Sequence, residues 1–297
     1  MPSQQSSNDA DISEAVDQLA SFELTDSQAN EKSSDTSADG ASEDEELWKP
    51  HAPTEECPVC FVPLSLLEHE SIYFVCCGKL ICYGCIAESR RALNVINAKR
   101  AKKKQPPLDN ACPFCRTAPK FTISEYKDRI RKGDGQAAWN LAYKYLVGDA
   151  RMNISKDEAK SSEILHHAAD DLGSAVAMAK LGLMYFYGFD RESTNKTKGQ
   201  KYLEEAAKLN NVPARSVLGN VEAQDENVDL AIRHWKLAAT AGEELSVKML
   251  WKFFFGGKLE KAELEETLRA HKEACDSMNS EERERRKLYE EAKERRE

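Results

Sequence analysis

The hydrophobic pattern changes several times along the chain. Residues 71–75 (SIYFV) are a β-branched and aromatic run that predicts a short strand, and residues 79–81 predict its returning partner. Residues 86–98 then carry apolar side chains at helical spacing. These three segments predict a small α+β module made of one hairpin and one helix.

Residues 133–275 contain a hydrophobic pattern that repeats. Leu141-Ala142-x-x-Tyr145-x-x-Gly148 returns forty residues later as Leu181-Gly182-x-x-Tyr185-x-x-Gly188. A degenerate copy follows at Leu218-Gly219 and a loose one at Met249-Leu250-x-x-Phe253-x-x-Gly256, with alanine pairs at 168–169, 206–207 and 238–239 between the copies. Two amphipathic helices per unit, at a period of about 30–40 residues, predict an all-α solenoid.

The repeat pattern also predicts how its helices pack. Small residues at fixed positions let paired helices approach closely, and the glycine after the first helix suits a left-handed C-cap. We expect the aromatic residues of these units to pack in the core, namely Trp139, Tyr143, Tyr145, Tyr185, Tyr187, Trp235, Trp251 and Phe253 to Phe255.

Both ends of the chain are highly charged. Residues 1–50 hold thirteen acidic residues and two lysines, which predicts a disordered segment. Within it, residues 12–24 (ISEAVDQLASFEL) are amphipathic and could form a helix on contact with a partner. Residues 276–297 alternate Glu with Arg and Lys, which predicts a solvated helix with i,i+4 ion pairs.

These patterns predict five segments. They are an acidic disordered segment (1–50), a cysteine-rich module (51–120), a connecting helix or linker (121–132), the repeat solenoid (133–275) and a charged helical tail (276–297). The net charge is −9, and the longest apolar run, at residues 181–189, is too short to cross a bilayer. The first twenty residues lack a signal peptide, so we expect an intracellular protein, cytoplasmic or nuclear, with no membrane partner.

Cysteine spacing supplies the strongest chemical signal. Eight of the nine cysteines form three Cys-x-x-Cys pairs and one adjacent pair: Cys57, Cys60, Cys76, Cys77, Cys82, Cys85, Cys112 and Cys115. Two thiolates at this spacing can face one ion, so eight thiolates suit two closed tetrahedral zinc sites. A disulfide framework needs an oxidising compartment, and a redox motif does not explain four clustered pairs. We therefore expect two structural Zn²⁺ ions, without which the module is unfolded.

The order of these cysteines resembles a RING finger. The run CCGKLICYGC, with cysteine in place of the usual histidine, resembles the all-cysteine, NOT4-like variant of that family. The resemblance implies a cross-brace, with Cys57, Cys60, Cys82 and Cys85 on one zinc and Cys76, Cys77, Cys112 and Cys115 on the other. Because neighbouring side chains on a strand face opposite ways, the backbone must bend at Cys76 and Cys77, where Gly78 gives freedom. Otherwise His51 or His69 would supply a ligand.

The same resemblance implies a surface for an E2 ubiquitin-conjugating enzyme. Val59 and Pro113 match its apolar contact residues, and Arg116 matches the arginine that donates hydrogen bonds to both E2 and ubiquitin. Alternatively, Val59 and Pro113 pack the zinc loops and Arg116 is a solvated charge. The sequence departs from the family in two ways: its central helix lacks a tryptophan, and a basic insert precedes Cys112.

The repeats resemble Sel1-like repeats, which are relatives of tetratricopeptide repeats. Together the two resemblances imply a RING-type E3 ubiquitin ligase, without a catalytic nucleophile of its own, whose repeats recruit a substrate. The alternative is a non-enzymatic adaptor with structural zinc. The basic run at residues 98–104 is predicted as a solvated loop, an import signal or a nucleic-acid contact. The acidic net charge argues against nucleic acid as the main partner.

Overall fold

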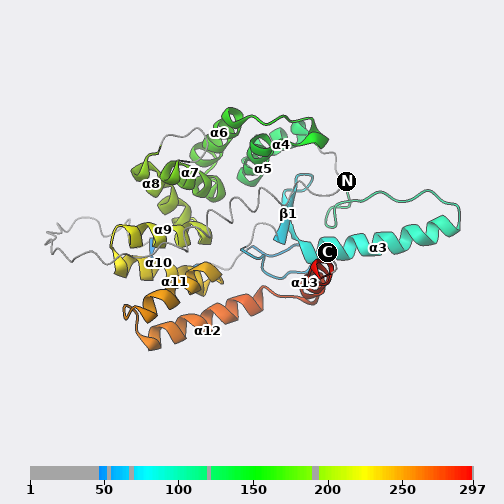
Figure 1. The fold of residues 1–297 in the computed structure, drawn as a ribbon. Coiled ribbons are helices and arrows are strands. Elements are labelled where there is room, and N and C mark those ends of the chain that lie inside the picture. Colours follow the sequence, from blue (N-terminus) through cyan, green and yellow to red (C-terminus); the bar gives the residue numbers. More distant parts are fainter. Residues whose placement is uncertain (1–46, 52–54, 67–69, 119–121, 189–193, 296–297) are drawn as a thin grey trace. The chain divides into compact units, whose positions relative to one another are not determined.

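The computed structural model describes residues 47–51, 55–66, 70–118, 122–188 and 194–295. Figure 1 follows these residues from the hairpin to the last helix. The amphipathic patch at residues 12–24, most of the acidic segment and His69 lie outside the described residues.

The cysteine-rich module contains the predicted hairpin and helix. Strands β1 (Ser71–Phe74) and β2 (Lys79–Cys82) pair antiparallel, with Ser71 opposite Cys82 and Phe74 opposite Lys79. Helix α3 (Tyr83–Lys102) follows β2 directly, and the Cys82 side chain accepts a hydrogen bond from the Cys85 N–H at its start. The helix is longer than predicted.

The basic run is therefore not a loop along most of its length. Residues 99, 100 and 102 form the last turn of α3, where cations interact favourably with the helix dipole. The helix ends before Pro106, whose carbonyl oxygen accepts a 2.7 Å hydrogen bond from Arg100 Nε. The prediction of a solvated basic loop is wrong up to Lys102.

The remaining described elements are helical. They are α4 (Ile123–Ile130), α5 (Gly135–Val147), a 3-10 turn η2 (Ala150–Met152), α6 (Glu158–His166), a π-helical turn η3 (His167–Asp171), α7 (Ala175–Tyr187), α8 (Lys196–Lys208), α9 (Val212–Gln224), α10 (Val228–Thr240), α11 (Glu244–Phe255), α12 (Lys261–Ser277) and α13 (Glu281–Glu294). Short polar N-cap side chains fix where several of them begin, because each accepts a hydrogen bond from a first-turn N–H. These caps include Asp134, Asp157, Ser174, Asn195 and Asn211.

The helices pack in consecutive pairs, α5 with α6, α7 with α8 and α9 with α10. Two glycines let α7 and α8 cross closely, as predicted. A Cβ atom at Gly182 would lie 2.7 Å from Leu203 Cγ, and one at Gly199 would lie 2.7 Å from the Phe186 backbone nitrogen. Gly188 ends α7 in the left-handed conformation, whereas Gly256 after α11 has φ −77°, so the predicted cap fails there.

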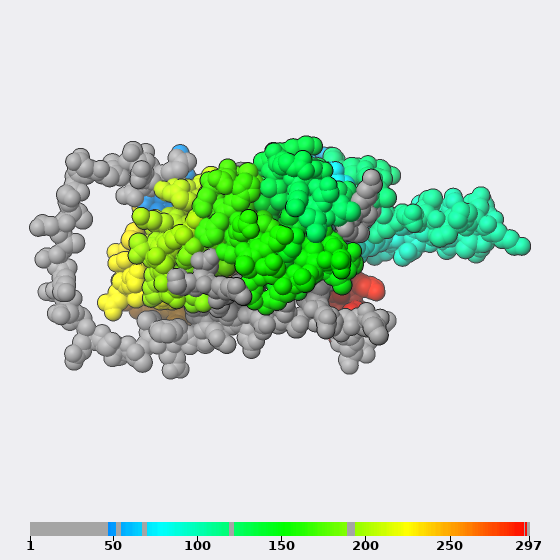
Figure 2. Space-filling view, turned by 90° about the horizontal axis from the view of Figure 1, so that it is seen from above, coloured from blue at the N-terminus to red at the C-terminus, as the bar shows by residue number. Residues whose placement is uncertain are grey.

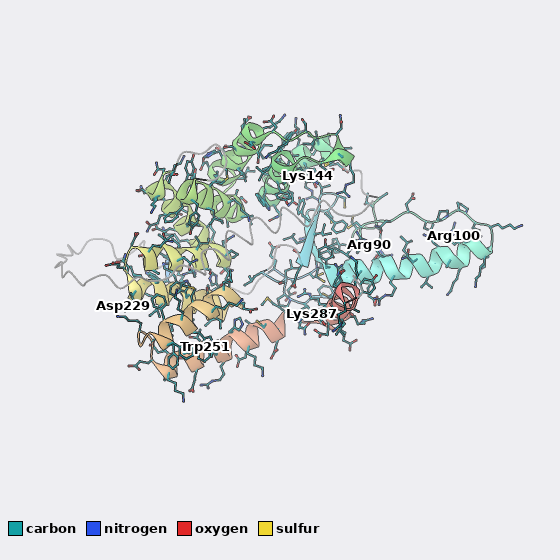
Figure 3. The ribbon with its side chains drawn as sticks, in the orientation of Figure 1. Arg90, Arg100, Lys144, Asp229, Trp251 and Lys287 are labelled. Carbon is teal, nitrogen blue, oxygen red and sulfur yellow. The ribbon has the colours of Figure 1, made fainter. Side chains whose placement is uncertain are left out.

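Of the ten aromatic side chains expected in the core, four are buried: Tyr145, Tyr185, Trp235 and Phe253. Four more are half-buried: Trp139, Tyr143, Tyr187 and Phe254. Trp251 and Phe255 are the exceptions. They are 38% and 79% exposed and stack on each other along α11, with ring centroids 5.6 Å apart. Figure 3 labels Trp251 on this helix. The prediction of core packing is wrong for these two residues.

The hairpin shares a hydrophobic core with the first repeat. Tyr73 of β1 and Val75, directly after the strand, pack with Tyr126 of α4 and with residues of α5. The Tyr73 hydroxyl donates a 2.6 Å hydrogen bond to Asp134 Oδ2, and Arg129 Nε donates a 3.0 Å hydrogen bond to the Val75 carbonyl. Helix α4 therefore joins the cysteine module to the repeats by packing as well as by chain connection.

Candidate functional site

Two groups of four cysteines lie in the module. Cys57, Cys60, Cys82 and Cys85 form the first cluster, and Cys76, Cys77, Cys112 and Cys115 form the second. Within each cluster all four sulfur atoms lie within 4.8 Å of one another, and all eight cysteines are free thiols. These are the sets that the RING resemblance implies.

Two matching turns present half of the ligands. In Cys57–Cys60 the Phe61 N–H donates to the Cys57 carbonyl at 2.8 Å, and in Cys112–Cys115 the Arg116 N–H donates to the Cys112 carbonyl at 3.0 Å. The residue after each turn is left-handed, with φ 59° at Phe61 and φ 62° at Arg116. The repeated hydrogen bonds hold both sulfurs of each pair on the same side of the turn.

The hairpin supplies the other ligands. Residues 75–78 form the turn between β1 and β2, so Cys76 and Cys77 lie in a turn rather than on a flat strand. The Gly78 N–H donates to the Phe74 carbonyl at 2.8 Å, and Gly78 has φ 68°. The backbone bends where the adjacent cysteines require it. Cys82 and Cys85 lie at the end of β2 and in the first turn of α3.

The sulfur spacing fits tetrahedral zinc. Four sulfurs about 2.3 Å from a zinc ion are separated by about 3.8 Å. The Cys60–Cys82 sulfur distance is 3.9 Å, Cys77–Cys112 is 3.8 Å and Cys76–Cys115 is 3.5 Å. Each cluster could therefore hold one metal ion with four protein ligands.

The clustered thiols influence one another's ionisation. A hydrogen bond from the Cys82 thiol lowers the pKa of Cys57 to about 4, and the same bond raises the pKa of Cys82. In the second cluster, burial raises the pKa of Cys77 to about 11. Because a metal binds thiolates, its binding would displace the protons these groups retain.

Of the two histidines considered as replacement ligands, His51 belongs to neither cluster. His51 Nδ1 instead lies 2.5 Å from the Asn210 side-chain oxygen, in the repeats. His69 lies outside the described residues.

Val59, Pro113 and Arg116, which match E2-contact residues of RING fingers, lie in or directly after the two cysteine turns. Val59 is 38% exposed, Pro113 is half-buried and Arg116 is exposed. Sequence reasoning missed their neighbours: Phe61 and Phe114 are also exposed, at 72% and 45%. The two turns thus present apolar side chains to solvent beside one arginine. The apolar character of Phe61 and Phe114 was the sequence signal that could have identified them as part of this surface.

The C-terminal helix α13 packs against α3, which the sequence did not predict. Arg283 donates hydrogen bonds to the Pro63 carbonyl at 2.6 Å and to the Val62 carbonyl at 3.3 Å. Arg285 pairs with Glu88 at 2.6 Å, and the Arg286 guanidinium lies 4.4 Å from the ring centre of Tyr83. One face of the charged tail is therefore held on the module rather than solvated.

The second half of α3 differs from the first. From Arg90 onward most of its side chains are exposed, among them Val95 and Ile96 at 51% and 45%. Arg90 and Arg100 mark this half in Figure 3, and no other described element covers it on the face seen in Figure 2.

Comparison with known proteins identifies the repeats. The Sel1 repeat family model matches residues 135–170, 175–211 and 219–243, which confirms the Sel1 repeats of the chain. The crystal structure of a Sel1 repeat protein from Oxalobacter formigenes is 27% identical over 44% of this chain and 97% of that chain, with a TM-score of 0.40. A protective antigen of uropathogenic Escherichia coli with an SLR fold is 19% identical over 50% of this chain and 32% of that chain, with a TM-score of 0.41.

No curated protein matches the chain. No RING family model matches the cysteine-rich stretch. Among the described residues, none of the helices has the length and apolar character needed to span a bilayer.

Proposed function

We propose that the chain is a RING-type E3 ubiquitin ligase with two structural zinc ions. The observation that carries the proposal is the interleaved order of the clusters: the first and third cysteine pairs form one, and the second and fourth form the other. Such interleaving clamps the hairpin and both cysteine turns together, which a pair of consecutive zinc sites would not do. With four protein ligands each, the ions hold structure and leave no position for an activated water.

The module would act by positioning an E2–ubiquitin thioester. Val59 and Pro113 supply apolar contacts on the two cysteine turns, and the exposed Arg116 guanidinium donates hydrogen bonds to E2 and ubiquitin. Holding the thioester next to an acceptor lysine accelerates transfer through proximity and orientation. Sel1 repeats point to protein–protein interaction, so residues 133–275 would bring the acceptor protein to the module.

Autoubiquitination with a panel of E2 enzymes tests the ligase. The zinc-loaded chain should be active with at least one E2, and both Val59→Arg and Arg116→Ala should reduce that activity by at least about tenfold. Arg90→Ala is the matched control, because Arg90 is an exposed arginine on α3 away from the cysteine turns. It should keep activity. If Arg116→Ala and Arg90→Ala have the same autoubiquitination activity, Arg116 does not have the proposed role of contacting E2 and ubiquitin.

A non-enzymatic adaptor is the second candidate, and a specific observation favours it. Trp251 and Phe255 form an exposed aromatic pair on α11, and aromatic residues are enriched in protein interfaces. Helix α13 also covers one face of α3 beside the cysteine turn that carries Val59. A zinc-loaded chain that is inactive with every E2 would favour the adaptor.

A further inference from the structure

Residues 47–51 lie along the second and third repeats. Leu47 packs against the core formed by α7, α8 and α9. Trp48 contacts α10, and His51 bonds to Asn210 in the turn between α8 and α9. Three side chains within five consecutive residues therefore contact three different parts of the solenoid, as those of a bound peptide do.

A buried arginine fixes the backbone of this segment. Arg215 of α9 is only 2% exposed, and its Nη1 donates to the Leu47 carbonyl oxygen. Its Nη2 donates to the Ala207 carbonyl at 3.2 Å. A buried guanidinium without acceptors is costly, so the helix pair presents a donor that requires a peptide carbonyl from outside the repeat.

Trp48 occupies a slot made by two successive residues of α10. The Arg233 guanidinium carbon lies 3.9 Å from the centre of the Trp48 ring, a cation–π geometry. The His234 ring centre lies 4.5 Å from that of Trp48, tilted by 40°. The slot therefore selects a flat, electron-rich ring, for which tryptophan is the best side chain.

A hollow continues beyond Trp48. It is lined by Trp48 together with Asp229, Arg233, Lys236, Leu259 and Glu263 of α10 and the α11–α12 region, and Figure 3 labels Asp229 on α10. Both charge signs and an apolar floor line this space. A longer bound segment would find further contacts there.

We propose that this face of the repeats, the Trp48 site, recognises short linear segments of partner proteins that carry a leucine–tryptophan pair. The site consists of Asn210, Arg215, Arg233 and His234, together with the part of the α7–α8–α9 core against which Leu47 packs. The chain's own residues 47–51 occupy the site, so a partner segment must displace them. The Trp48 site would thus define the class of partner that the repeats recruit. Its biological use rests on the ligase function proposed above, but peptide binding to the site can be measured separately.

Attachment in the same chain makes the resident segment a strong competitor. A short tether gives an effective concentration on the order of millimolar. A free peptide of the same sequence that binds with micromolar affinity is therefore largely excluded from the wild-type chain. Removing the Leu47 and Trp48 side chains should open the site.

Fluorescence anisotropy with a labelled peptide tests the proposal on the full, zinc-loaded chain. The probe is a synthetic peptide of residues 45–51 (EELWKPH). It should bind the Leu47→Ala/Trp48→Ala chain at least about tenfold tighter than the wild type, because the competitor is gone. Adding Arg233→Ala should weaken that binding by at least about fivefold, as loss of a cation–π contact implies. Arg269→Ala, which changes an exposed arginine of α12, should not.

A peptide with alanine in place of tryptophan repeats the test from the ligand side, should the Arg233→Ala chain fail to fold. Equal affinity for the wild-type and opened chains, or no binding to the opened chain, would overturn the proposal. So would tight binding of the alanine peptide. None of these results affects E2-dependent activity, so a failure here is distinguishable from a failure of the ligase proposal.

Discussion

Among single residues, the buried basic groups around the Trp48 site are the most unusual. Burial, together with the nearby positive charge of Arg215, lowers the pKa of His51 to about 4 and that of His234 to about 3. Burial also lowers the pKa of Arg215 to about 10. Two neutral histidines thus lie beside guanidinium groups, and a proton added to either ring would be buried next to a positive charge.

These pKa values predict that acid weakens docking. A free peptide histidine titrates near 6.5, whereas docked His51 titrates near 4. Between those values the undocked peptide binds more protons, so docking is fully favourable above pH 6.5 and is lost progressively as the pH falls toward 4. Labelled peptide should bind the opened chain at least about tenfold more weakly at pH 5.5 than at pH 7.5.

A peptide with asparagine in place of histidine at position 51 is the control for this pH dependence. It lacks the titrating ring of His51, so its affinity should fall less between the two pH values; what remains belongs to His234. If both peptides bound equally well at pH 5.5 and 7.5, the buried, neutral state of His51 would be contradicted.

Among the elements, the crossing of α7 and α8 depends on glycine. A Cβ at Gly199 would lie 2.7 Å from the Phe186 nitrogen and 2.8 Å from the Gly182 oxygen, which are backbone atoms that cannot rotate away. Gly199→Ala should therefore lower the free energy of unfolding by about 1–3 kcal/mol in urea titration. At Gly256 a Cβ would meet only ordinary contacts at 3.5 Å and φ is −77°, so Gly256→Ala should leave stability unchanged or slightly higher. Equal losses in both variants would exclude close helix approach as the cause.

Arg283 hydrogen-bonds α13 to the first cysteine turn. Its partly buried guanidinium donates to the carbonyls of Val62 and Pro63, and hydrogen bonds to charged groups contribute about 1.5–3 kcal/mol. Arg283→Ala should therefore speed amide hydrogen exchange throughout residues 281–294. Arg295→Ala, at the end of the same helix, should leave exchange at α13 unaltered, because that side chain is 71% exposed and its ion pair is with Glu291 of the same helix. Protection retained in Arg283→Ala would show that α13 is held by other contacts.

For the molecule as a whole, the arrangement of local patterns was predictable and several long-range contacts were not. The β-branched run and the helical periodicity are local patterns, so they were enough to predict the hairpin and the Sel1 helix pairs. The division of the eight cysteines into two sets was expected from the resemblance to a RING finger. Arg283 and Arg215 contact backbone carbonyls 220 and 168 positions away. A carbonyl has no sequence signature, so neither contact leaves a pattern to detect.

Two further differences have similar physical reasons. Trp251 and Phe255 lie on α11 at unspecified positions of the repeat pattern Met249-Leu250-x-x-Phe253-x-x-Gly256, and both are exposed. Helix α4 was expected only as a connecting helix or linker, because its buried residue Tyr126 packs against Tyr73, which lies far away in the sequence. Periodicity identifies an apolar or aromatic face, but tertiary packing decides whether it is buried.

The whole account rests on two zinc ions bound by eight sulfurs. Native mass spectrometry of the intact chain measures this directly. We predict two zinc ions per wild-type chain and per Cys275→Ser chain, because Cys275 lies in neither cluster, and a single tightly bound ion in Cys77→Ser. A wild-type chain that carries no zinc, or one that retains both ions after Cys77→Ser, would contradict the two-zinc module.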